Sequence, residues 1–133
     1  MKIKKTDIID GMERESSLLS VNLEDKNGVS MYDTVFIDHN ELLYGAISEA
    51  VGNLTQCMQS FVAVYGEDAE GYEWSLTKGE PYGLADDVLN YIVDCAMSEW
   101  CIKVLKDGGD YAGRANAALQ NVARKLYFKS CPV

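Results

Sequence analysis

The spacing of apolar residues divides the chain into helical stretches separated by polar, glycine-containing segments. Over residues 7–19 the apolar residues recur at intervals that place them on one face of a helix. They are Ile8, Ile9, Met12 and Leu19. Thr6 or Asp7 can cap this helix, since a side-chain oxygen there accepts an unpaired backbone N–H. We therefore expect a short N-terminal helix over 7–19.

Residues 20–34 carry no sustained periodicity, and Asn27-Gly28 is a turn signal. We expect a loop, with room for a short extended piece around Ser20 to Leu23. A capping-box pattern follows, with Asp38 as the N-cap and Glu41 three residues later. It predicts a second helix of roughly 22 residues. Its apolar stripe repeats at three and four: Leu43, Ile47, Ala50, Leu54, Met58 and Phe61.

The period then changes from helical to alternating. Phe61–Tyr65 and Tyr72–Thr77 are rich in β-prone residues, and the acidic link 66–71 joins them. In the second run Tyr72, Trp74 and Leu76 alternate with polar residues, which is typical of a strand with one covered face. We therefore expect a small β-hairpin.

Two further helices complete the pattern. The third is predicted from about Leu84 to Lys106, with Trp100 in the middle of its apolar stripe and therefore buried. The fourth begins after Asp110 as a possible cap and ends near Ser130. The carboxylates Asp94 and Glu99 fall on the polar side of the third helix, where we expect them to be solvated.

Together these elements predict one domain over 1–133 of the mainly α class. It is a helical bundle of a short N-terminal helix and three longer helices, with the β-hairpin between helices two and three. The composition agrees, since 47% hydrophobic and 25% charged residues are ordinary values for a globular domain.

The net charge of −9 argues against whole-surface binding to nucleic acid or to an anionic membrane, because both require a positive field. No apolar run approaches the roughly 20 residues that span a bilayer. The N-terminal lysines are followed by acids rather than by an apolar stretch, so we expect no secretory signal and a cytoplasmic location.

The sequence gives little support for metal binding or for redox chemistry. The cysteines Cys57, Cys95, Cys101 and Cys131 lack paired C-x-x-C spacing, and three of them lie in apolar helical stretches. We expect reduced thiols that act as small hydrophobes, and no zinc. The acids of the hairpin link and its second strand also lack the order of a calcium loop, so we expect no cofactor.

Catalytic patterns are also missing from the sequence. It contains no phosphate-binding glycine loop and no nucleophile elbow. His39, the single histidine, could serve as a base for a cysteine nucleophile, but an exposed residue beside a helix cap is the simpler interpretation. We therefore expect a protein that is not an enzyme.

A charge asymmetry marks the end of the chain. From Tyr111 onward the sequence has four cations and no acid. They are Arg114, Arg124, Lys125 and Lys129. One interpretation is that the cations complement the C-terminal end of the last helix dipole. The other is a basic patch that docks an acidic surface, such as a neighbouring copy of the same protein.

The layout resembles small proteins encoded among the head–tail genes of phages and prophages of intestinal bacteria. The resemblance rests on Tyr32-Asp33-Thr34-Val35-Phe36 before the acidic cap of Asp38 and Glu41. It continues on the third and last helices with Asp87, Tyr91, Trp100, Ala115-Asn116, Leu119, Tyr127, Lys129 and Pro132. It covers most of the chain loosely and includes no catalytic motif.

This resemblance implies a head–tail connector, or neck, protein: a small helical domain that assembles as a ring on a portal. The expected partners are other virion proteins or further copies of the chain. We expect Tyr72, Trp74 and Leu76 of the hairpin of one subunit to dock near the cations of the last helix of the next subunit. The alternative is a small bacterial protein-binding or regulatory helical domain.

Overall fold

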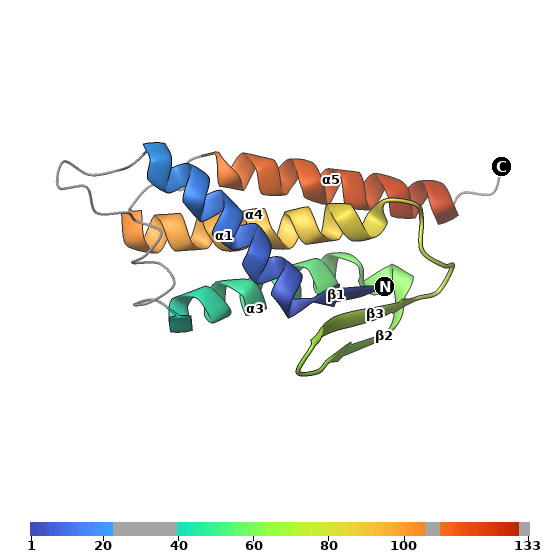
Figure 1. The fold of residues 1–133 in the computed structure, drawn as a ribbon. Helices are drawn as coiled ribbons and strands as arrows, with labels where there is room; N and C mark the ends of the chain where they lie inside the picture. Colours follow the sequence, from blue (N-terminus) through green and yellow to red (C-terminus); the bar gives the residue numbers. More distant parts are fainter. Residues whose placement is uncertain (23–39, 106–109, 131–133) are drawn as a thin grey trace.

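The computed structural model describes residues 1–22, 40–105 and 110–130 (Figure 1). Its elements along the chain are β1 (Lys2–Lys4), α1 (Lys5–Asn22), α3 (Asn40–Cys57), a 3₁₀ turn (Gln59–Phe61), β2 (Val62–Glu67), β3 (Gly71–Leu76), α4 (Leu84–Leu105) and α5 (Tyr111–Ser130). The described part is mainly helical, with a small antiparallel sheet. This confirms the predicted mainly α class, but within the described residues α1 is not short, since it has 18 residues, as many as α3.

Helix α4 is the centre of the molecule. In Figure 1, α5 runs along one side of α4 and α3 along the other, while α1 crosses α4 diagonally. Because α4 has neighbours on several sides, most of its residues between Tyr91 and Cys101 are buried. Trp100 is only 1% exposed, which confirms its predicted burial.

The sheet contains one strand more than the predicted hairpin. Its order is β1–β3–β2, and both pairings are antiparallel. The N-terminal residues pair with the hairpin through the register Ile3 to Tyr72, and the Met1 ammonium donates to the Trp74 carbonyl at 2.9 Å. Strand β1 was not predicted, because Lys2–Lys4 is too short to show a strand period.

Gly71 allows β1 to approach this closely. A Cβ at this position would lie 2.2 Å from the backbone oxygen of Ile3, well inside van der Waals contact. The glycine is therefore required where the two backbones meet.

Several predicted boundaries shift. Helix α1 begins at Lys5 and continues to Asn22, so residues 20–22 are helical rather than part of a loop; 23–34 lie outside the described residues. Helix α3 ends at Cys57, four residues before Phe61, where its apolar stripe ends. There the Phe61 N–H donates to the Met58 carbonyl at 2.8 Å, which tightens the chain into the 3₁₀ turn before the β-prone run begins.

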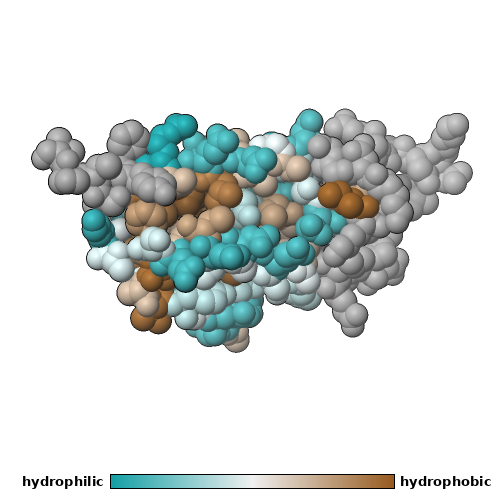
Figure 2. Space-filling view, turned by 180° about the vertical axis from the view of Figure 1, so that it is seen from behind, coloured by the Kyte–Doolittle hydropathy of each residue, from teal (hydrophilic) through white to brown (hydrophobic). Residues whose placement is uncertain are grey.

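The surface mixes apolar and polar residues. Figure 2 shows the face opposite to that of Figure 1, with apolar surface gathered toward one end and polar surface across the middle. The large apolar side chains that are exposed in the described part are Tyr44, Val64, Tyr65, Tyr82 and Ile102. None of the described helices is long and apolar enough to cross a lipid bilayer.

Candidate functional site

The apolar face of the hairpin belongs to the core of the protein itself. Tyr72 is 4% exposed and Trp74 is fully buried. The Trp74 indole N–H donates to the Thr55 hydroxyl of α3 at 2.9 Å. Leu76 is half-buried and packs against the same core.

The prediction that Tyr72 and Trp74 form an exposed docking face is therefore wrong. The alternation of residues correctly indicates a strand with one covered face, but the chain covers this face itself. The helices supply this cover, as the hydrogen bond from Trp74 to Thr55 of α3 shows, whereas β1 pairs with the edge of β3.

The outer edge of the hairpin remains open. Strand β2 is at the end of the sheet, and within the described ranges no strand pairs with its second edge. Its residues from Ala63 to Glu67 are exposed, and the exposed fraction of Val64 is 64%. Tyr65 is 40% exposed, although its ring also contacts that of Trp74 with centroids 5.6 Å apart. A row of backbone donors and acceptors thus faces outward beside two exposed apolar side chains.

The acids of the hairpin are partly neutralised by the N-terminal strand and helix. Lys5 Nζ lies 3.0 Å from Glu67 Oε2, and Lys2 Nζ lies 3.1 Å from Glu70 Oε2. The backbone N–H groups of Gly71 and Glu70 donate to Asp68, and they lower the pKa of this carboxyl. The link between the strands is therefore less available as a free acidic surface than its composition suggests.

Two of the four cations of the last helix are also occupied within the chain. Arg114 Nη2 lies 2.9 Å from Glu15 Oε1, and Lys125 forms an ion pair with Asp87. Arg124 is exposed, and the side chain of Lys129 lies outside the description. Arg114 and Lys125 thus tie α5 to α1 and α4, which overturns the interpretation of all four residues as one free basic patch.

The prediction for the carboxylate of Asp94 is also wrong. We expected it to be solvated, but the residue is 7% exposed. Helices α1 and α5 bring Glu15 and Arg114 to this side of α4, and Arg114 Nη2 lies 3.5 Å from Asp94 Oδ1. Burial raises the pKa of Asp94, Arg114 opposes the shift and Glu15 adds to it. In the same cluster, burial and the neighbouring Glu15 raise the pKa of Tyr111 to about 12.

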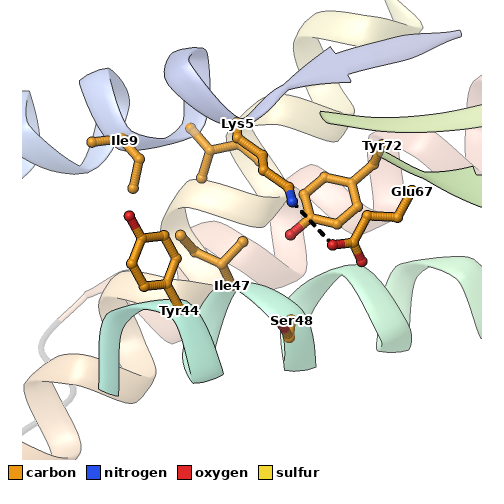
Figure 3. A pocket seen from close by; sticks show the side chains of 8 residues that line it. Lys5, Ile9, Tyr44, Ile47, Ser48, Glu67 and Tyr72 are labelled. Carbon is orange, nitrogen blue, oxygen red and sulfur yellow. Dashed lines mark hydrogen bonds and ion pairs between the residues drawn. The ribbon is translucent and has the colours of Figure 1, made fainter. Parts of the chain in front are cut away.

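A cavity of about 220 Å³ lies between α1, α3 and the end of the hairpin (Figure 3). Its apolar wall is formed by Ile8 and Ile9 of α1 and Ile47 of α3. Its polar end carries Lys5 and Glu67, and the remaining lining residues are Tyr44, Ser48 and Tyr72.

This cavity was not predicted from the sequence. Its lining comes from α1, α3 and the hairpin strands β2 and β3, which are separate segments of the chain that only the fold brings together. The one available signal was the position of Lys5 and Glu67 next to apolar stripes, which is common at the surface of a globular domain.

The thiols show little sign of special reactivity. Cys57, Cys95 and Cys101 form no disulfide in the described structure. Cys101 is buried and Cys95 is partly buried, but Cys57 is exposed, so it does not act as the small core residue we expected. Burial raises the pKa of Cys95, which disfavours the nucleophilic thiolate. In the described ranges, histidine, cysteine and acidic residues form no group of three or more that could hold a metal ion. His39 and Cys131 lie outside these ranges.

Searches against family models, curated proteins and solved structures find no match to this chain. The segment Tyr32–Phe36, on which the resemblance to phage proteins partly rests, also lies outside the described residues.

Proposed function

We propose that this protein is a structural assembly subunit that acts through protein–protein contacts. The observation that carries the proposal is the open edge of β2, flanked by the exposed side chains of Val64 and Tyr65. An uncovered edge strand is a template on which a strand of another chain can add, because its outward N–H and C=O groups lack partners in the sheet.

Natural domains commonly protect such an edge with lysine, proline or a covering element. β2 has the sequence VAVYGE, with no lysine or proline, although its pairing with β3 is irregular between Val62 and Val64. An edge that combines β-prone residues with exposure is better suited to a partner than to solvent.

The class of assembly that we propose is the head–tail connector of a phage, on the basis of the resemblance in sequence layout. In such a connector the hairpin contacts the next subunit through the β2 edge, because Tyr72 and Trp74 are buried in the core of their own chain. A contact between this edge and a different surface of the next subunit is head-to-tail, and such contacts close into rings. A bacterial protein-binding domain would use the same edge for a partner that is not a virion protein.

Gene order separates these two classes first. If the chain is a connector, portal and capsid genes lie beside its gene in the genome that encodes it. Neighbouring genes that encode no virion proteins would contradict the connector class and favour the bacterial binding domain.

A pair of matched variants then tests the edge itself. Val64→Lys places a charge on the edge strand, whereas Ser75→Lys places the same charge on the central strand at the paired position. We expect Val64→Lys to weaken binding to the purified portal complex or to further copies of the chain by about tenfold or more. Ser75→Lys should leave binding within about twofold, and circular dichroism should show both variants folded.

The measurement is sedimentation of the labelled subunit with and without the portal complex. Equal binding by both variants, or equal loss in both, would contradict the use of the β2 edge.

A further inference from the structure

We propose that the cavity between α1, α3 and the hairpin is a binding site for a small primary amine with a compact apolar body, such as an arylalkylamine. This inference goes beyond the assembly function and does not depend on it. The cavity lies on the inner side of the sheet and is lined by residues other than the edge residue Val64.

The polar end of the cavity already holds an ammonium group. Lys5 Nζ lies 3.0 Å from Glu67 Oε2 and 5.4 Å from the centroid of the Tyr72 ring (Figure 3). A carboxylate and the face of an aromatic ring are the two features that recognise an organic cation. The side chain of Lys5 thus marks where the amine of a ligand would sit.

Lys5 can give up this position. Its side chain is 34% exposed and that of Glu67 is 50% exposed, and ion pairs this accessible to water are weak. Lys5 can therefore turn into solvent, where its ammonium is well hydrated, while the amine of the ligand takes its place beside Glu67 and Tyr72. The net charge of −9 on the whole chain also favours a cation over an anion.

The rest of the cavity is suited to an apolar group. Ile8 is fully buried and Ile47 is 3% exposed, so they form a fixed wall. Figure 3 shows Tyr44 at the end of the cavity opposite to Glu67, with its hydroxyl directed toward Ile9. An aromatic ring or a branched chain would replace water between these side chains.

The volume sets the size of the ligand. A dry protein cavity of about 150 Å³ holds one benzene ring. The 220 Å³ here therefore matches one ring with a short aminoalkyl arm, and it is too small for a nucleotide or a folded peptide segment.

The test compares phenethylamine with phenylacetate, which share the ring and differ in the sign of the charge. Each is titrated into the ¹⁵N,¹³C-labelled protein while the methyl signals of Ile8, Ile9 and Ile47 are followed by NMR. We expect saturable shifts of these methyls with phenethylamine and several-fold weaker binding of phenylacetate. No saturable shift with phenethylamine, or shifts located elsewhere, would overturn the proposal.

Three variants fix the role of the polar end. Glu67→Gln should weaken binding of the amine by about tenfold. Glu70→Gln removes the same charge from a residue that does not line the cavity, and should change binding by less than about twofold. Lys5→Met should strengthen binding of the amine, because it removes the competing ammonium.

Whether Lys5→Met strengthens or weakens binding of the amine is decisive. If Lys5→Met abolishes binding and phenylacetate binds more tightly than phenethylamine, Lys5 is an anion-binding residue and the proposal is wrong. Thermal melting of each variant shows whether the fold is retained. A variant that unfolds is replaced by Lys5→Gln or Glu67→Ser, for which the same signs are expected.

Discussion

Trp74 and Trp100 are both buried, but the surroundings of their indole N–H groups differ. The N–H of Trp74 donates to the Thr55 hydroxyl, whereas that of Trp100 has no hydrogen-bond partner in the described structure. An unsatisfied buried donor costs free energy, while a satisfied one contributes to stability. The two tryptophans therefore form a natural pair for comparing the same substitution.

We predict that Trp74→Phe lowers the free energy of unfolding by about 1 kcal/mol more than Trp100→Phe does, because only the first loses a hydrogen bond. Trp100→Ala should cost about 3–5 kcal/mol, since it leaves a large cavity in the core. Urea unfolding followed by circular dichroism measures all three values. An equal or larger loss for Trp100→Phe would contradict the assignment of these hydrogen bonds.

Asp94 makes a pH-dependent contribution to stability. Because its pKa is raised in the folded state, the folded protein holds the proton more tightly than the unfolded chain does. The stabilisation is present below the ordinary pKa of 3.8, and it is lost as the pH rises through the raised pKa.

Asp94→Asn cannot ionise, so we predict that its stability relative to the wild type increases between about pH 3.5 and pH 7. Urea midpoints at several pH values test this, and Asp86→Asn of the exposed first turn of α4 serves as the control. A difference between Asp94→Asn and wild type that is constant with pH, or that falls as pH rises, would contradict the buried position of Asp94.

At the scale of elements, the attachment of β1 depends on Gly71. We predict that Gly71→Ala lowers the free energy of unfolding by about 1–3 kcal/mol, because the added methyl overlaps the backbone of Ile3. Gly66→Ala is the matched control, since its added Cβ meets nothing within 4 Å on the exposed strand β2.

Hydrogen exchange locates the effect. In Gly71→Ala the amide of Trp74, which donates to the Met1 carbonyl, should exchange faster as β1 detaches. In Gly66→Ala it should keep its protection. Unchanged protection of this amide in Gly71→Ala would show that β1 is held by other contacts.

The helices were largely predictable from sequence, because long apolar stripes report a buried face directly. The predicted helix from Leu84 matches α4 up to Leu105, while Lys106 lies outside the described residues, and α5 covers the predicted stretch from Tyr111 to Ser130. The residues at which helices end were less predictable, since α1 continues past Leu19, the last apolar residue of its stripe.

The site was less predictable than the fold, for a physical reason. The alternation of Tyr72 and Trp74 indicates a covered face but does not identify its cover, and the three residues of β1 are too few to show a period. The polarity of Asp94 suggested exposure, because its burial depends on two other helices crossing α4 at that point. Features that depend on contacts between distant segments cannot be read from local patterns.

At the scale of the whole molecule, we predict that the fold does not depend on a disulfide. Cys57, Cys95 and Cys101 form no disulfide in the part of the chain that the structure describes. The melting temperature of the purified protein should therefore be the same with and without dithiothreitol. A fall of several degrees in the presence of the reductant would reveal a stabilising disulfide.

In the described part of the molecule, β2 is the outermost strand of the sheet and lies on the side away from α4 and α5 (Figure 1). Under the proposed function, an outer edge in this position lets one subunit contact the next without disturbing the helical core. This arrangement is what we expect of a subunit that repeats around a ring.

The most direct test of the assembly claim is an electron cryo-microscopy reconstruction of the phage particle or portal complex that contains this chain. We predict density for the subunit at the head–tail junction, with the outer edge of β2 paired to a strand of a neighbouring chain. Absence of the chain from the particle, or a β2 edge that faces only solvent there, would contradict the account.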